Sequence, residues 1–281
     1  MPLYSRRISL QVGDIIIKEL NIEFDVSKYI TSEPNTLTAK IYNLSEDLRT
    51  RMASFPFSQG VKEKDGTTSV ALTAGYKDDV SGIFVGRLRQ VRSYREEGDI
   101  ITEIEAGDGE KTQGVRFSRS YRAGTALKDV LRDLTTEMGI GIGNLDEQLA
   151  TASQFTGISN NIANGISLHG YAVDILSKLL ESRNLDWSIQ DQALQILGFN
   201  KGLTGSAIKL DADSGLIGVP TMDNKGILTA TTLMIPDMNP GKRVQISSEF
   251  VNGLFRITKA NYKGSLFGST YEINLEGKAP I

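Results

Sequence analysis

The stretch GLFRITKANYKGSLFGSTYEINLEG, residues 253–277, decides the fold prediction because a similar stretch, GIFVGRLRQVRSYREEGDIITEIEAG, stands at residues 82–107. Each begins with a glycine and an apolar pair and continues through a polar segment that contains one tyrosine. Each then returns in a segment with a period of two, so that every second residue lies on the same face. Alternation with a period of two is typical of a half-buried strand, so each stretch is predicted to form an antiparallel hairpin.

A further alternating strand precedes each hairpin. Val70, Leu72 and Ala74 stand before the first hairpin, and Val244 and Ile246 stand before the second. The shared unit is therefore predicted to contain at least three antiparallel strands. Because alternation is a common pattern, two unrelated β-meanders are the alternative explanation of the match. We favour two β-domains of similar build.

Composition narrows the classes of function. The 281 residues include no cysteine and a single histidine, His169, which excludes disulfides, thiolate zinc sites and a three-histidine metal site within one chain. The formal net charge of −3 provides no positive field that would attract nucleic acid. No apolar run reaches the roughly 18 residues of a membrane span, and no signal peptide is recognised at the N-terminus. We expect a soluble protein made in the cytoplasm.

The remaining patterns divide the chain into β, mixed and β regions. Strand alternation dominates residues 3–107, interrupted by a short helix that begins after Ser45 and by a long loop over residues 55–69. After about residue 203 the strand pattern returns. The sequence therefore predicts domains at 1–110, 111–200 and 201–281, with an α+β fold that is mainly β.

The middle region is predicted to be a small α/β unit. One helix starts near Thr125 and ends at Gly139, and a second follows Gly170 and ends near Asn184. A loop is expected over residues 154–165. A hairpin is expected over residues 186–197, with its turn at Asp191-Gln192.

The order of several segments resembles the central baseplate hub proteins of bacteriophage tails, the late-control-D-like family. These segments are GYKDDVSGIFVGRL (75–88), EIEAGDGEK (103–111), AVDILSKLLESRN (172–184), DWSIQDQALQIL (186–197), KLDADSGLIGVP (209–220) and MIPDMNPGKRVQI (234–246), together with the stretch at 253–277. The likeness covers nearly the whole chain, and it is strongest from residue 187 to residue 276.

The resemblance implies a specific architecture and role. It implies two tail-tube-like antiparallel β-barrel domains that flank the small α/β middle region, and assembly as a homotrimer. Three chains with two barrels each would form a pseudo-six-fold ring that adapts a six-fold tail tube to a three-fold spike and lines the central channel. The barrel edges would pair across chain boundaries, which would also protect exposed strand edges.

The resemblance also implies partners and a location. The partners are other copies of this chain, the tail tube protein, other baseplate proteins and a spike, which we expect to be a separate protein because the chain ends soon after the last strand. DNA and the tape measure protein would pass through the lumen without specific binding, and no membrane is involved. The protein is expected in the virion tail baseplate, assembled in the host cytoplasm.

The candidate interface or lumen residues are Arg87, Arg89 and Arg92; Arg87 and Arg89 are predicted to share one face of a strand, with Arg92 and Arg95 beyond. Arginine is well suited to pairing with carboxylates at interfaces, whereas a solvated strand face is the simpler interpretation. A second basic cluster, Arg116, Arg119 and Arg122, stands in an apparent linker with no assigned role.

No catalytic, cofactor or metal site is predicted, and we expect that the protein is not an enzyme. Three patterns resemble sites, and each has a simpler interpretation. His169 beside Ser167 could be a base and a nucleophile, but a local hydrogen bond at a helix start is simpler, and Glu103 with Glu105 could be paired catalytic carboxylates, but a solvated strand face is simpler. GIGIGN (139–144) could be a phosphate loop, but a helix cap and turn is simpler. The alternative functions are a tail-tip enzyme that degrades cell wall and a hub-like component of a contractile secretion machine.

Overall fold

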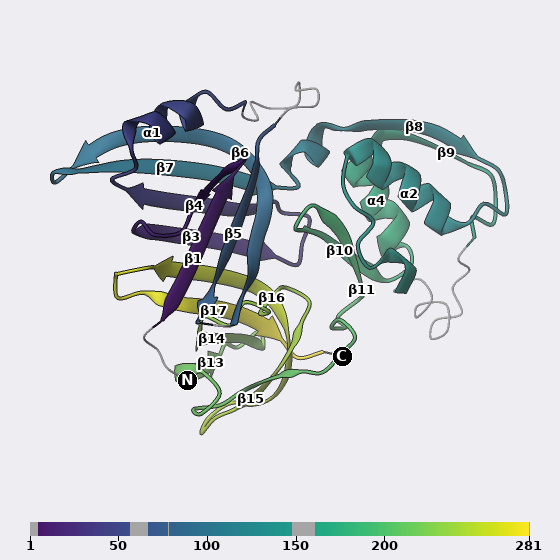
Figure 1. Ribbon diagram of the computed structural model, residues 1–281. Helices are drawn as coiled ribbons and strands as arrows, with labels where there is room; N and C mark the ends of the chain where they lie inside the picture. The colour runs from purple at the N-terminus through teal and green to yellow at the C-terminus, as the bar shows by residue number, and fades with distance from the viewer. Residues whose placement is uncertain (1–4, 57–66, 78, 148–160, 281) are drawn as a thin grey trace.

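The computed structural model describes residues 5–56, 67–77, 79–147 and 161–280 (Figure 1). The N-terminal strands are β1 (Arg6–Val12), β2 (Ile15–Ile17), β3 (Ile22–Tyr29), β4 (Asn35–Tyr42), β5 (Ser69–Tyr76), β6 (Asp79–Glu96) and β7 (Asp99–Asp108), with helix α1 (Glu46–Ala53) between β4 and β5. The C-terminal strands are β12 (Ile208–Leu210), β13 (Leu216–Met222), β14 (Ile227–Leu233), β15 (Arg243–Ser247), β16 (Asn252–Ser265) and β17 (Tyr271–Lys278). The expectation of a mainly β protein is confirmed.

Both β regions belong to one sheet. Within the described ranges, a 13-stranded sheet runs in the order β13-β14-β17-β16-β3-β4-β7-β6-β5-β1-β2, and β12 and β15 join it beside β16. Strand β16 pairs antiparallel with β3, which connects the two ends of the chain. We call this pairing the internal joint. Almost all strand pairs are antiparallel, and β12 with β15 is a parallel exception.

The repeated sequence forms the same unit twice. Strands β3-β4-β7-β6-β5 form the first unit and β13-β14-β17-β16-β15 form the second, in the same order. The units even share a bulge: Leu88 pairs with Ala106 before Arg89 is skipped, and Ile257 pairs with Gly277 before Thr258 is skipped. A one-residue bulge at the same place fixes the correspondence of the two units residue by residue.

A continuous hydrophobic core underlies both units. It includes the inward positions of β3 and β4 from the first unit and of β14, β16 and β17 from the second. Strands β1 and β5 cross in front of the sheet (Figure 1). Tyr271 of β17 fastens this crossing layer, because its hydroxyl accepts a hydrogen bond from the Gly75 amide at 2.8 Å and lies 2.9 Å from the Arg7 carbonyl oxygen, to which it can donate. Burial raises the pKa of Tyr271 to about 12.

A second hydrophobic core lies in the middle region. It is formed by the helices α2 (Leu127–Met138) and α4 (Ala172–Glu181), the hairpin of β8 (Arg116–Tyr121) with β9 (Ile166–Tyr171), and the hairpin of β10 (Leu185–Gln190) with β11 (Ala193–Gly198). A short 3-10 helix, η2 (Glu110–Gly114), precedes β8. Both helices have one apolar face and pack with that face inward, as their sequence periodicity predicts.

Several local predictions are confirmed. Gly139 ends α2 in the left-handed conformation at φ 67°, and the β10–β11 turn lies at Asp191-Gln192 with positive φ at both residues. Positive φ at both central residues is the geometry of a two-residue hairpin turn that matches the twist of its strands.

Other predictions need correction. Residues 116–121 are strand β8 and not a linker, since they pair with β9 through a full antiparallel register. Helix α4 ends at Glu181, before Asn184, and Ser45 stands at the N-cap of α1 without a capping hydrogen bond from its side chain. The loops predicted over 55–69 and 154–165 lie largely outside the described residues.

Candidate functional site

One face of the sheet is polar across six neighbouring strands. Alternate residues of these strands point away from the core, and register places them in rows across the sheet. One row consists of Gln90, Glu105, Thr38, Asp25, Lys263 and Glu272. We call this surface the polar face; its residues are mostly half-buried by their cross-strand neighbours, while the opposite positions of the same strands form the core.

Charges of both signs lie on the polar face. The carboxylates include Glu23, Asp25, Glu103, Glu105, Glu272 and Glu276, and the cations include Lys40, Arg92, Lys259, Lys263 and Lys278. Two ion pairs cross between strands, Lys263 with Asp25 at 3.4 Å and Lys259 with Glu276 at 3.3 Å. Such a surface is well hydrated and has little attraction for a polyanion.

The three predicted arginines do not act as a single cluster. Arg92 lies on the polar face, where its Nη2 is 2.6 Å from Glu103 Oε1. Arg87 instead donates to Thr67 Oγ1 at 2.6 Å. Arg89 is the bulged residue, and its guanidinium covers the backbone of Gly107. Arg92 thus forms an ion pair with a carboxylate of the polar face, whereas Arg87 and Arg89 make their contacts beside it.

Glu103 corrects the prediction of a solvated strand face. Its side chain is only 7% exposed, and it accepts hydrogen bonds from Arg92 and, at 3.1 Å, from the Tyr94 hydroxyl. A carboxylate held by an arginine and a tyrosine is fixed in place as an ion-pair partner. This arrangement ties β6 to β7 and gives Glu103 a structural role.

The internal joint carries a dense set of polar contacts on the polar face. Asn261 Nδ2 donates to Asp25 Oδ1 at 2.6 Å and to Ser27 Oγ at 3.0 Å, and the Lys259 ammonium lies 5.6 Å from the centre of the Tyr29 ring. On the core side, the ring of Phe24 lies over Gly264, where an added Cβ would stand 2.5 Å from it. The joint is therefore fastened on both faces of the sheet.

A buried lysine links the sheet to the middle region. Lys28 of β3 is fully buried, and its Nζ donates to both carboxylate oxygens of Asp191, at 3.1 and 3.0 Å, and to Asn239 Oδ1 at 3.0 Å. Asp191 also accepts from the Val85 amide at 3.0 Å. The β10–β11 turn is thereby held against β3 and β6. We call these contacts the polar junction.

Asp108 extends the polar junction inside the protein. It accepts from the Gln192 amide at 2.9 Å and from Asn35 Nδ2 at 3.2 Å. Burial is the main cause that raises the pKa of Asp108 to about 6, and the nearby Asp191 carboxylate adds to it. Sequence analysis missed the junction, although Lys28 continues the apolar phase of Ile22, Phe24 and Val26, and a lysine in that phase is a signal of a buried, paired charge.

The residues considered for catalysis are placed differently from the prediction. His169 lies in β9 and not at a helix start, and its Nδ1 is 2.7 Å from Ser118 Oγ, whereas Ser167 bonds with Ser120. Among the contacts of the described residues, no carboxylate is hydrogen-bonded to His169. A serine and histidine pair without an orienting acid lacks the arrangement that activates a serine nucleophile.

The glycines of GIGIGN form a cap and a turn, as expected. Beyond Gly139, the amide and carbonyl of Gly141 bond with Gln192 and Leu194, which fastens this segment to β11. A phosphate loop would leave such amides free to bind an anion. The segment is therefore structural.

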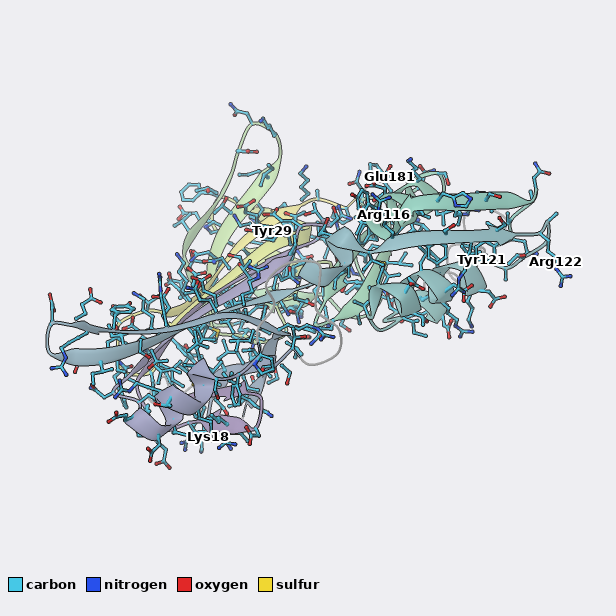
Figure 2. The ribbon with its side chains drawn as sticks, turned by 90° about the horizontal axis from the view of Figure 1, so that it is seen from above. Lys18, Tyr29, Arg116, Tyr121, Arg122 and Glu181 are labelled. Carbon is cyan, nitrogen blue, oxygen red and sulfur yellow. The ribbon has the colours of Figure 1, made fainter. Side chains whose placement is uncertain are left out.

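The second basic cluster is spread along β8. Arg119 pairs with Asp133 at 2.9 Å, and the Arg116 guanidinium lies 5.0 Å from the centre of the Tyr171 ring. Arg122 stands at the far end of the β8–β9 hairpin (Figure 2). Two of the three arginines are thus engaged in contacts that stabilise the middle region.

The described part of the chain contains no group of three or more His, Asp or Glu residues that could hold a metal ion. None of its helices is long and apolar enough to cross a bilayer.

Comparison with known proteins gives one family and several similar folds. The family described as Baseplate hub gp41 matches residues 6–267. No curated protein matches the chain. Among solved structures, the 43 kDa tail protein of prophage MuSo2 from Shewanella oneidensis is similar with a TM-score of 0.67 at 10% identity, over 98% of this chain and 97% of that chain.

Two further structures have a similar fold. The tail protein from Neisseria meningitidis MC58 gives a TM-score of 0.64 at 10% identity, over 98% of this chain and 97% of that chain. The E. coli c3393 protein, a component of the type VI secretion system described as similar to T4 bacteriophage tail proteins gp27 and gp5, gives 0.58 at 8% identity, over 96% of this chain and 76% of that chain. At these identities the likeness is one of fold.

Proposed function

The chain belongs to the baseplate hub gp41 family of phage tail proteins, as its sequence indicates, and from this premise we propose that it is the structural hub of a tail baseplate, a homotrimer that forms a pseudo-six-fold ring. In this proposal the ring adapts the six-fold tail tube to a three-fold spike and lines the central channel.

The observation that carries the proposal is the internal joint. Two units with the same strand order and the same bulge stand side by side in one sheet, joined through β16 and β3. A chain that places two equivalent units next to each other supplies two neighbouring positions of a ring. Three such chains, related by cyclic symmetry, supply six.

The polar face supports the assignment of the channel lining. It lies on the side of the sheet opposite the core, and it carries charges of both signs with ion pairs between strands. A channel through which DNA passes needs a hydrated wall that does not hold the phosphates. We therefore assign DNA and the tape measure protein as molecules that pass through the lumen without specific binding.

The proposed partners follow from the two ends of such a ring. One end would contact the tail tube protein, and the other a separate spike protein, with other baseplate proteins around the outside. The same architecture would serve a hub-like component of a contractile secretion machine, and the similar fold of a type VI secretion component keeps this context as the second candidate.

The oligomer's mass and symmetry test the proposal. Native mass spectrometry is expected to give three times the chain mass of 30.7 kDa, and negative-stain microscopy is expected to show a ring with six lobes and three-fold symmetry. A monomer, or a ring of another symmetry, overturns the proposal.

We also assign no enzymatic role to the protein. Incubation with purified peptidoglycan is expected to release no soluble fragments. Release that is lost in Ser118→Ala or His169→Ala, with the protein still folded, would overturn the structural assignment in favour of a tail-tip enzyme.

A further inference from the structure

The geometry points to a second joint, between copies of this chain: residues 92–94 of β6 in one copy pair antiparallel with Thr221 and Met222 of β13 and with Asp223 directly after them in the next copy. We call it the outer joint. This inference rests on the proposed homotrimer and specifies which strand edges close the ring and in which register.

The internal joint is the template. The first part of β16 pairs with β15, and the part after the bulge, residues 259–265, pairs with β3. The first part of β6 pairs with β5 in the same way. After its bulge, β6 pairs on one side with β7, and no strand of the described ranges pairs with its other side. The edge that β16 presents to β3 is thus present on β6 without a partner strand in the described part of the chain.

The matching edge is on β13. Strand β13 corresponds to β3, and within the described residues it pairs only with β14. The correspondence is supported by the next strand, where Leu37, Thr38 and Ala39 of β4 occupy the positions of Leu228, Thr229 and Ala230 of β14. Within the described residues, each copy therefore has one unpaired strand edge of each kind, which is what a closed ring of identical subunits requires.

The register follows from the internal joint. There Asn261 pairs with Ser27, Tyr262 with Val26 and Lys263 with Asp25. Transferring these positions through the shared bulge places Arg92 opposite Asp223, Ser93 opposite Met222, and Tyr94 opposite Thr221. On the polar face, Arg92 of one copy would thus stand opposite Asp223 of the next copy. The internal joint has a corresponding cation and anion, Lys263 of β16 and Asp25 of β3.

The exposed apolar side chains of β13 also indicate that this strand edge has a partner. Met222 stands at the position of Val26, which is fully buried by the internal joint, yet Met222 is 53% exposed. Val219 and Ile217 of the same strand are also exposed. A single chain thus leaves an apolar strand edge uncovered at the position where the equivalent edge of the first unit is covered by β16. A second copy of β6 would cover it.

Helix α1 does not block the edge of β6. The helix packs beside β6, in the connection between β4 and β5. The second unit has residues 234–242 in the same connection, and these also lie beside β16, because the Tyr262 hydroxyl is 3.4 Å from the Pro236 carbonyl oxygen. Strand β3 nevertheless pairs with β16. The helix and the partner strand can therefore occupy β6 together.

Disulfide trapping tests the register. The chain has no native cysteine, so the double variant Ser93→Cys with Met222→Cys contains only the two thiols of the outer joint. Under mild oxidation we expect covalent dimers and trimers, with no larger species, on a non-reducing gel. Two Cys residues can be bridged only when their Cα atoms lie within about 7 Å, so the reaction reports the register directly.

The matched control is Arg95→Cys on β6 with Asn224→Cys in the β13–β14 turn, two exposed positions that lie four residues out of the proposed register. It is expected to give no more covalent oligomer than either single variant. Circular dichroism of the reduced proteins checks that both double variants fold as the parent does.

The outcomes separate the two proposals. A native trimer mass without cross-linking of the Ser93 and Met222 pair overturns the outer joint and leaves the homotrimer intact. Equal cross-linking of the control overturns the register. A monomeric mass overturns the proposed function together with the outer joint, and covalent chains longer than three overturn the closed ring while supporting the paired edges.

Discussion

The two five-strand units differ most at the strand that begins each of them. In the first unit, β3 is eight residues long, alternates regularly and pairs with β16 over residues 23–29. In the second unit, β13 is interrupted, because residues 218–220 together stand opposite the single residue Ala230. This bulge includes Gly218 in the left-handed conformation and Pro220, which has no amide hydrogen to donate.

The difference shows how the regularity of a strand edge can depend on whether its partner strand belongs to the same chain. The partner of β3 belongs to the same chain, so a long and regular edge is covered as the chain folds. The edge of β13 is open in the single chain. A bulge and a proline shorten such an edge and limit its pairing with wrong strands. The short part after the bulge, Thr221 and Met222 with Asp223 directly after them, is what the second unit retains for a partner.

The two units also fill the same space in the core with an aromatic residue and a glycine in exchanged positions. In β6 the ring of Phe84 lies against Gly86, and in β16 the ring of Phe255 lies against Gly253. The aromatic residue and the glycine have changed places along the strand. The same core space is filled in both units. The fold therefore conserves the total side-chain volume at this place more strictly than the residue at each position.

The largest expected effect comes from removing the charge that anchors β3. Lys28→Met removes the ammonium from Asp191 and Asn239 and leaves Asp191 with the Val85 amide as its donor, and β13 has no equivalent buried lysine within its strand. Since breaking a buried ion pair costs 3–5 kcal/mol and Asp191 is partly exposed, we expect a loss of about 3 kcal/mol in the free energy of unfolding. Urea denaturation measures it, and Lys18→Met, at an exposed lysine (Figure 2), is the control. Equal losses in both variants contradict the anchoring role.

The polar junction should also be sensitive to pH. Burial raises the pKa of Asp108 to about 6 in the folded protein, above its usual value of 3.8, so the folded state binds this proton more tightly than the unfolded state does. The contribution to stability is therefore full below about pH 4 and is lost as pH rises to about 6. We expect the wild type to lose about 3 kcal/mol relative to Asp108→Asn across this interval. Parallel stability curves for the two proteins between pH 4 and pH 7 would contradict this.

The sequence predicted the parts of this comparison that depend on local pattern. Alternation located the strands, and the repeat at 82–107 and 253–277 indicated two units. It did not reveal that β16 pairs with β3, because an antiparallel joint between residues far apart in the chain leaves no local signal. The triplet Leu-Thr-Ala marks equivalent strands at 37–39 and 228–230, but it also occurs at 72–74 in a strand that is not equivalent, so the triplet alone could not identify the match.

The candidate site was only partly predictable for the same reason. Arg87, Arg89 and Arg92 are close in sequence, which predicts one group of interface or lumen residues, yet the bulge at Arg89 shifts the alternation and the three side chains have different partners. A bulge depends on pairing across strands and is not visible in one strand's pattern. His169 was judged by its nearest serine in sequence, whereas its contact is Ser118 on the opposite strand.

The internal joint can be weakened directly on its core side. In Gly264→Ala, the added Cβ would stand 2.5 Å from the buried ring of Phe24, so the strands must separate or the ring must move. Overpacking of this kind typically costs 1–3 kcal/mol, and we expect about 2 kcal/mol from thermal or urea unfolding. Gly82→Ala on β6 is the matched control, because an added Cβ there meets no atom within 4 Å. A neutral Gly264→Ala would show that Phe24 does not fasten the joint.

The smallest effect is expected at the edge that the single chain leaves open. Arg92 is 55% exposed, so its pair with Glu103 is screened by solvent, but Glu103 is buried and keeps only Tyr94 as a side-chain donor when Arg92 is removed. We expect Arg92→Ala to lower the free energy of unfolding of the monomer slightly, and Arg87→Ala, which loses one hydrogen bond to Thr67, by less. If the outer joint exists, the two variants separate further during assembly. Arg92→Ala then raises the protein concentration needed for trimer formation, measured by analytical ultracentrifugation, because Asp223 of the neighbouring copy loses its cation, whereas Arg87→Ala leaves that concentration unchanged. The reverse order of the two variants would place the contact between copies elsewhere on β6.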